Sequence, residues 1–197
     1  MTEEDIFYTI SDNVGEGYYT EKRSKFLAYA HHVCSQEEIK DIITKYRNRY
    51  YDARHVCYAY MLGAERKIFR ANDDGEPGST AGKPILGQIN SLNLTDVLVV
   101  VVRYYGGVNL GTGGLIVAYR TAAAEALQHA QVVTQQVMET ITYDFSYPLM
   151  NDVMRIVKEM SPKIIAQSFD NTCSITLAIR RSQADQLRQR LARLSFL

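Results

Sequence analysis

Apolar residues in the first part of the chain fall into runs that predict alternating strands and helices. Residues 25–33 (KFLAYAHHV) have the pattern of a strand. Ser35 and Glu38 have the spacing of a capping box, which predicts that a helix follows them. Residues 54–62 and 66–71 alternate well enough to predict two paired strands. The chain therefore begins as a mixture of strands and helices.

The next apolar stretch predicts the centre of a sheet. Residues 96–105 (DVLVVVVRYY) hold a run of consecutive valines bounded by loops, which is typical of a strand buried on both faces. Apolar residues recur at helical spacing before and after it, so we expect helices over residues 80–93 and 115–130. The second of these helices is rich in alanine, and its small side chains should let it pack close to the sheet.

The last third of the chain predicts a second, smaller fold. A strand over residues 138–147 precedes a helix over 148–160. The segments KIIAQSFD and CSITLAIR predict a hairpin across Asn171, and Ser182 opens a final helix. This βαββα order is that of a ferredoxin-like fold without its last strand, because the closing SFL is too short to form one.

A short polar segment separates the two parts. Residues 132–136 (VVTQQ) are interpreted as a linker. We therefore expect an N-terminal domain over residues 1–134 and a C-terminal domain over residues 135–197. The fold class that follows is α+β in two domains.

Composition and charge narrow the class of protein. A chain with 46% hydrophobic and 22% charged residues is globular rather than disordered. Its 22 basic and 22 acidic residues cancel, so no overall positive field points to nucleic acid or a membrane. The N-terminus lacks the apolar core of a signal peptide, and no apolar run is long enough to span a bilayer. We expect a cytoplasmic monomer with no membrane partner.

The cysteines and the C-terminal arginines can each be explained without a functional role. Cys34, Cys57 and Cys173 show no C-x-x-C spacing, so we expect packing residues in a reducing compartment. Arginines gather in the final strand and helix, where they predict either a solvated helix face or a contact with nucleic acid. The nucleic-acid candidates are Arg181, Arg188, Arg190 and Arg193.

Two polar loops carry the candidate chemistry. The acidic loop, residues 72–84 (NDDGEPGSTAGKP), has no large apolar side chain, and the glycine loop, residues 106–114 (GGVNLGTGG), follows the predicted central strand. Their backbone N–H groups could line an anion site to which Arg54, Lys83 and Arg103 add positive charge. Neither loop is a phosphate-binding P-loop. We expect residues 72–82 and 104–114 to lie side by side at one end of the sheet, with Arg54, His55 and Arg103 between them.

Three interpretations of the acidic loop stay open. Asp73, Asp74 and Glu76 are oxygen ligands that, with His55, would suit a metal-assisted hydrolase. The same residues would also serve as turn formers, with carboxylates accepting backbone N–H groups. A nucleophile at Ser79 or Thr80, with His55 and Asp73 as base and orienting acid, is the third possibility, which the spacing does not demand. The turn interpretation is the commoner use of these residue types.

Four segments resemble one family. KRSKF (22–26), DARHVCYAY (52–60), DDGEPGSTAGKPIL (73–86) and VVVRYYGGVNLGTGGLIVAY (100–119) together resemble the IMPACT family, and the length resembles its bacterial two-domain members. The resemblance implies an N-terminal α/β sandwich like domain two of ribosomal protein S-five, and a C-terminal ferredoxin-like domain. The chain departs from the family at Ser79, where glycine is usual, and Gly78 is expected to take over the backbone role of that glycine.

The resemblance also implies a function. Eukaryotic members restrain the general-control pathway of translation, so we expect a non-enzymatic, translation-associated regulatory protein without a cofactor or a metal. Its expected partners are the ribosome, RNA or a translation factor, and the metal-assisted hydrolase is the alternative. The candidate binding residues are Arg54, His55, Asp73, Asp74, Glu76, Thr80, Lys83, Arg103, Gly106, Gly107, Gly111, Gly113 and Gly114.

Overall fold

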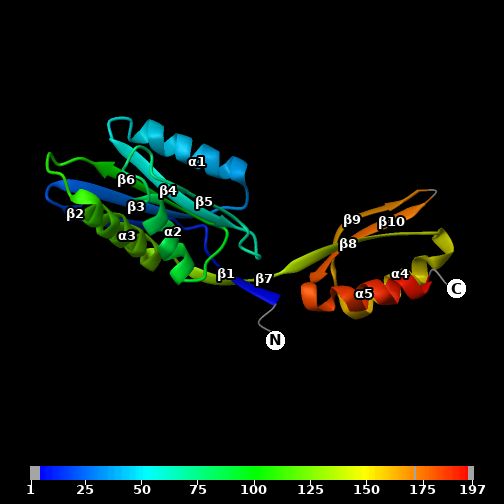
Figure 1. The fold of residues 1–197 in the computed structure, drawn as a ribbon. Helices are drawn as coiled ribbons and strands as arrows, with labels where there is room; N and C mark the ends of the chain where they lie inside the picture. Colours follow the sequence, from blue (N-terminus) through cyan, green and yellow to red (C-terminus); the bar gives the residue numbers. More distant parts are fainter. Residues whose placement is uncertain (1–4, 171, 195–197) are drawn as a thin grey trace. The chain divides into compact units, whose positions relative to one another are not determined.

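The computed structural model describes residues 5–170 and 172–194, which form two compact units (Figure 1). The larger unit runs from Phe7 to Gln135, and the smaller one begins at Gln136. Asp5 belongs to the smaller unit, because its carbonyl accepts the N–H of Val137 and its carboxylate accepts the N–H of Ser182. Asp5 and Ile6 therefore go with the smaller unit, whereas the predicted division at residue 134 placed them in the N-terminal domain.

The larger unit is built on a sheet of strands in the order β2-β3-β6-β4-β5, in which all paired neighbours are antiparallel. A separate pair of strands, β1 and β7, lies outside this sheet. The described elements are β1 (Ile6–Ile10), β2 (Gly15–Glu21), β3 (Ser24–His32), α1 (Gln36–Arg49), β4 (His55–Leu62), β5 (Ile68–Asn72), α2 (Gly82–Ser91), β6 (Val97–Tyr104), α3 (Gly111–His129) and β7 (Val132–Gln136).

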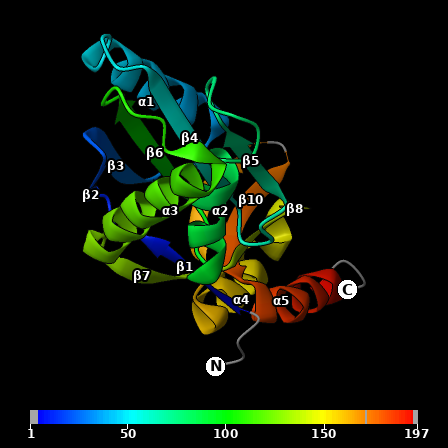
Figure 2. The same ribbon diagram turned by 60° about the vertical axis from the view of Figure 1, so that its left-hand side comes forward.

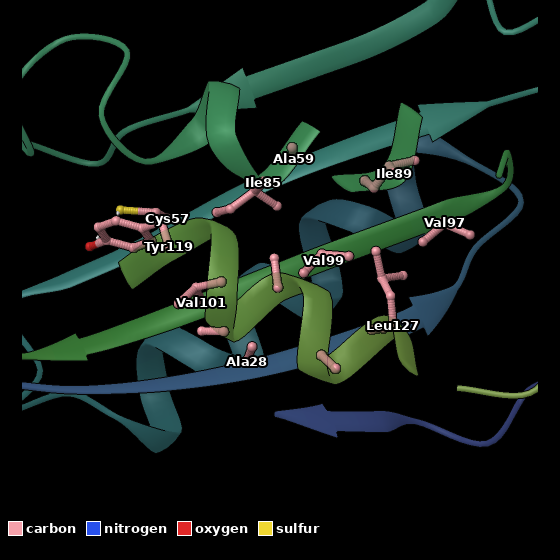
Figure 3. Packing of buried hydrophobic residues seen from close by; sticks show 14 of the residues in the cluster. Ala28, Cys57, Ala59, Ile85, Ile89, Val97, Val99, Val101, Tyr119 and Leu127 are labelled. Atoms are coloured by element: carbon pink, nitrogen blue, oxygen red, sulfur yellow. Dashed lines mark hydrogen bonds between the residues drawn. The ribbon is translucent and has the colours of Figure 1, made fainter. Parts of the chain in front are cut away.

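The central strand β6 is buried on both faces, as its run of valines predicted. Val97, Val99 and Val101 belong to the core shared with α2 and α3, as Figure 3 shows. The alternate residues Leu98 and Val100 belong to the core shared with α1. The sheet is thus covered by α1 on one face and by α2 and α3 on the other, and burial of both apolar faces supplies most of the driving force for this arrangement.

Helix α3 lies close to strand β2. Figure 2 shows α2 and α3 on the same side of the sheet. A Cβ atom on Gly17 of β2 would stand 2.5 Å from the carbonyl oxygen of Ala122 in α3, so only glycine fits at this position. The alanines of α3 and the glycines of β2 therefore allow the close packing that the sequence predicted for this helix.

Two differences from the predicted elements have simple physical causes. Residues 132–136, interpreted as a linker, form β7, which pairs with β1. Most of its side chains are exposed, so its hydrophobic pattern gave no strand signal and the backbone pairing alone defines it. The predicted glycine loop ends early, because Gly111 already begins α3. Strands β1 and β2 were not predicted.

The smaller unit has the predicted βαββα order. Its strands form an antiparallel sheet in the order β8-β10-β9, and α4 and α5 share an apolar core with it. The absence of a fourth strand was predicted from residues 195–197, which lie outside the described residues. The elements are β8 (Met138–Phe145), the 3-10 turn η2 (Tyr147–Leu149), α4 (Met150–Met160), β9 (Lys163–Phe169), β10 (Cys173–Arg180) and α5 (Arg181–Leu194).

The capping box predicted before α1 is present. The Ser35 hydroxyl accepts the N–H of Glu38 at 3.2 Å, and the Glu38 carboxylate accepts the N–H of Cys34 at 2.8 Å. Cys34 is exposed in this turn, so its predicted packing role was wrong, whereas Cys57 and Cys173 are buried. Among the described helices, none is long and apolar enough to cross a membrane.

Candidate functional site

Asp73 of the acidic loop caps helix α2 from a distance in sequence. Its Oδ1 atom accepts the N–H groups of Ala81 at 3.0 Å and Gly82 at 2.8 Å, and its Oδ2 atom accepts the N–H of Ser79 at 2.8 Å. Ala81, at the N-cap position, has no side-chain oxygen to do this. Partial burial raises the pKa of Asp73, but the three backbone donors and Lys83 together bring it below its ordinary value of 3.8. The carboxylate is therefore a structural anion.

Asp74 ties the acidic loop to the sheet and to α1. Its Oδ2 atom accepts the N–H of Val56 at 2.7 Å, and its Oδ1 atom lies 2.8 Å from Nη2 of Arg47. Its carbonyl oxygen is 2.7 Å from Nδ1 of His55. Because a carbonyl oxygen can only accept, Nδ1 of His55 carries the hydrogen in this contact. The loop is thereby joined to both strand β4 and helix α1.

Glu76 is the buried centre of the site. Its side chain is 3% exposed, and its Oε1 atom accepts hydrogen bonds from Nη1 of Arg103 at 2.6 Å and from the hydroxyl of Tyr119 at 2.7 Å. Nε2 of His55 lies 3.8 Å from its other oxygen. A buried carboxylate is stable only when it is paired and hydrogen-bonded in this way. Glu76 therefore joins the acidic loop to strand β6 and helix α3.

Cys57 and Tyr119 complete the buried network, and neither was among the candidate binding residues. The Cys57 thiol lies 3.0 Å from the carbonyl oxygen of Asp73 and 3.3 Å from the Tyr119 hydroxyl. Burial raises the pKa of both groups, so both keep their protons at neutral pH. Figure 3 shows the sulfur and the ring next to each other. A polar group on an otherwise apolar strand or helix face was the signal in the sequence.

The glycine loop is held against the start of β3. A Cβ atom on Gly106 would stand 2.2 Å from the carbonyl carbon of Arg23, so glycine is required there. The N–H of Gly106 donates to the hydroxyl of Ser24 at 3.1 Å. Gly107 and Gly111 take positive φ angles of 87° and 71°, whereas Gly113 and Gly114 lie in the first turn of α3. The loop is fixed by backbone geometry and by one buried serine.

The two loops meet at one end of the sheet around a cavity of about 530 Å³, which we call the signature pocket. Of the candidate residues, Arg54, His55, Glu76, Arg103 and Gly111 line it, and the other candidates do not. Tyr105, Asn109 and Thr112 also line it and were not among the candidates. The full lining is Arg54, His55, Gly75, Glu76, Pro77, Arg103, Tyr105, Asn109, Leu110, Gly111, Thr112 and Leu115.

The arrangement does not support the metal-assisted hydrolase. The described residues contain no group of three or more His, Cys, Asp or Glu side chains that could hold a metal ion. Asp73 and Asp74 accept hydrogen bonds from the fold itself, and neither lines the pocket with His55. The Thr80 hydroxyl donates to the carbonyl of Pro77 at 2.6 Å, so it is not directed at His55 as a nucleophile. The turn interpretation describes these side chains.

Ser79 adopts the left-handed backbone that the family pattern assigns to glycine. Its φ angle is 68°, and Gly78 does not take a positive φ. The expectation that Gly78 takes over the role of the missing glycine was therefore wrong. The N–H of Ser79 donates to the Asp73 carboxylate in this turn. Lys83, in the first turn of α2, is exposed.

The C-terminal arginines do not share one set of contacts. Arg188 pairs with Glu139 and with Asp185, and Arg190 pairs with Glu159. Arg181 begins helix α5, and Arg193 lies exposed in its last turn. The structure therefore does not bring the four candidates together as one set of unpaired cations.

Comparisons with known proteins agree with the fold. The Impact N-terminal domain matches residues 22–127, which contain both loops and the pocket. IMPACT family member YigZ of Escherichia coli is 31% identical over 87% of this chain and 85% of its own length. IMPACT family member YvyE of Bacillus subtilis is 34% identical over 78% of this chain and 70% of its own length.

A solved structure extends the likeness to the smaller unit. The crystal structure of a hypothetical protein, 28% identical, superposes with a TM-score of 0.77 over 97% of this chain and 93% of that one. Fold and site together define a two-unit α+β protein with an Impact N-terminal domain. The chain belongs to the IMPACT family.

The capping role of Asp73 can be tested by substitution and pH. Asp73→Ala leaves the backbone donors at the start of α2 unpaired, so we expect a loss of about 1–2 kcal/mol in the free energy of unfolding, measured by urea denaturation at pH 7. Because the folded pKa lies below 3.8, the ionised carboxylate stabilises the fold above that pH, and this stabilisation disappears as the pH falls below it. The difference between wild type and Asp73→Asn should therefore shrink on acidification; an unchanged difference would contradict the role.

A substitution that relieves the backbone strain at Ser79 should stabilise the protein, whereas the loss of Asp73 destabilises it. Ser79→Gly should raise the free energy of unfolding by about 0.5–1 kcal/mol, because glycine adopts positive φ at no steric cost and the relief exceeds the added entropy of the unfolded chain. Ser79→Ala is the matched control, since it keeps the Cβ atom and the strain. Equal stability of the glycine and alanine variants in urea denaturation would show that the backbone at this position carries no strain.

Proposed function

We propose that this chain is a non-enzymatic regulatory protein of translation, which acts by binding a component of the translation machinery through the face around the signature pocket. Membership of the IMPACT family supports the proposal, since the family resemblance implies a role in translation control. The component is the ribosome, its RNA or a translation factor, which would place the chain in the cytoplasm.

One observation carries the choice of binding over catalysis. The three carboxylates of the acidic loop all accept hydrogen bonds from the fold: Asp73 from the start of α2, Asp74 from Val56, and Glu76 from Arg103 and Tyr119. A general base needs a free lone pair directed at its substrate, and a catalytic metal needs several converging ligands. Carboxylates that are used to hold two loops in place favour a rigid recognition surface.

The position of the positive charge favours the pocket face over helix α5. Arg188 and Arg190 already face carboxylates, and a phosphate would have to compete with these for their charge. Arg54 is exposed at the pocket, with its guanidinium carbon 5.5 Å from the ring centroid of Tyr105. An exposed guanidinium over an aromatic ring suits a contact with RNA or with an acidic protein surface.

Co-sedimentation with ribosomes over a series of salt concentrations tests the proposal. We expect association at low salt that weakens as salt rises, and a loss of at least about tenfold in affinity for Arg54→Glu, because a contact to phosphate or carboxylate is replaced by repulsion. Arg120→Glu is the matched control, since Arg120 is exposed on α3 and does not line the pocket. Arg188→Gln with Arg190→Gln should leave the salt dependence nearly unchanged.

Two results would contradict the proposal in different ways. No association at low salt would remove the ribosome as the partner. Association that Arg54→Glu and Arg120→Glu weaken equally would move the contact away from the pocket face. In the second case a reduced salt slope for the Arg188 and Arg190 variant would assign the contact to helix α5.

A further inference from the structure

The signature pocket is lined by more positive than negative charge. Arg54 and Arg103 contribute two guanidinium groups, and Glu76 contributes the one carboxylate of the lining. The guanidinium carbons of both arginines lie 5.5 Å from the ring centroid of Tyr105. Glu76 is already paired with Arg103, so the exposed charge of Arg54 has no carboxylate of the lining to balance it. The pocket therefore favours an anion.

Helix α3 adds the positive end of its dipole to the same pocket. It is 19 residues long, its N-cap residue Leu110 provides no side-chain acceptor, and its first turn contains no acidic residue. Gly111 and Thr112, at its start, line the pocket. The first N–H groups of a helix have no partner within the helix, and they attract anions when no side chain caps them.

An independent observation points to a missing acceptor. The Arg103 side chain is 6% exposed, and its Nη1 atom is bound to Glu76. Its Nε atom is buried and has no hydrogen-bond partner within the part of the chain that the structure describes. Leaving a buried, charged N–H unpaired is costly, and native proteins rarely do so. Arg103 lines the pocket, and an anion that reached its Nε atom there would supply the acceptor.

We propose that the signature pocket binds the phosphoryl group of a phosphate monoester. A phosphoryl group has three oxygens that accept hydrogen bonds from backbone N–H groups, from guanidinium groups and from a hydroxyl such as that of Thr112. A carboxylate has fewer acceptors for the same set of donors. Tyr105, which is 41% exposed, also lines the pocket and holds both guanidinium groups over its ring.

The size of the pocket agrees with this class of ligand. A volume of about 530 Å³ exceeds what a free phosphate ion fills and lies within the range of pockets that hold small organic ligands. The inference rests on the proposed function only in using the same pocket. A phosphorylated end of RNA and a free nucleotide share this chemistry, and the experiment below separates them.

Titration of the ¹⁵N-labelled full chain, followed by amide NMR, tests the proposal. The probes are inorganic phosphate, adenosine 5′-monophosphate, adenosine and acetate. We expect saturable shifts of the Gly111 and Thr112 amides with both phosphates, and none with adenosine or acetate at the same concentrations. Arg54→Gln should raise the dissociation constant by about tenfold or more, whereas Arg120→Gln, which removes the same charge from the exposed face of α3, should leave it unchanged.

The outcomes separate the sources of the phosphoryl group. Tighter binding of the nucleotide than of inorganic phosphate assigns the site to a phosphate monoester. If a 5′-phosphorylated oligoribonucleotide then binds more tightly than the nucleotide and its unphosphorylated form does not, the source is an RNA end; otherwise it is a free nucleotide. The absence of saturable shifts, equal binding of acetate, equal affinity for inorganic phosphate, or an Arg54→Gln variant with unchanged affinity would each overturn the proposal.

The result is independent of the ribosome experiment. Phosphoryl binding by a chain that does not associate with ribosomes would leave the pocket assignment intact and remove the proposed function. Ribosome association that depends on Arg54, without phosphoryl binding, would do the reverse.

Discussion

The buried ion pair between Glu76 and Arg103 is the interaction on which the rest of the site depends. Glu76 lies in a loop without large apolar side chains, and such a loop gains little by burial of its own. Its carboxylate becomes buried because Arg103 on β6 and Tyr119 on α3 both donate to it. Removing either partner would leave a charge or a donor unsatisfied in a place with little water. The pair thereby determines where the acidic loop meets the end of the sheet.

The remaining polar groups of the site also hold the loops in place by hydrogen bonds. Asp73 caps α2, Asp74 joins the loop to β4 and α1, and Ser24 holds the glycine loop. Each of these groups acts on backbone N–H groups that the loops could not satisfy on their own. The result is a fixed pocket that is open to solvent at Arg54 and Tyr105, and that leaves the uncapped start of α3 facing its interior. Such a surface recognises a ligand by charge and shape.

The sequence predicted the parts of this structure that depend on burial and on local capping. The run of valines predicted β6 and the capping box predicted the start of α1, because each of these signals comes from residues that are close together in the sequence. Strand β7 gave no such signal, because it is defined by backbone pairing with a distant strand. The meeting of the two loops was expected from their chemistry, but the roles of Cys57 and Tyr119 depend on long-range contacts that the pattern of a single strand or helix does not contain.

A double-mutant cycle on Glu76 and Arg103 tests the central claim most directly. Hydrogen exchange of the β6 amides in wild type, Glu76→Gln, Arg103→Met and the double variant gives the free energy of unfolding of the larger unit. The account predicts that each single change costs about 3–5 kcal/mol and that the double change costs less than the sum by about 2 kcal/mol or more, because no buried charge is left unpaired. Additive losses would contradict the claim that this pair holds the site together.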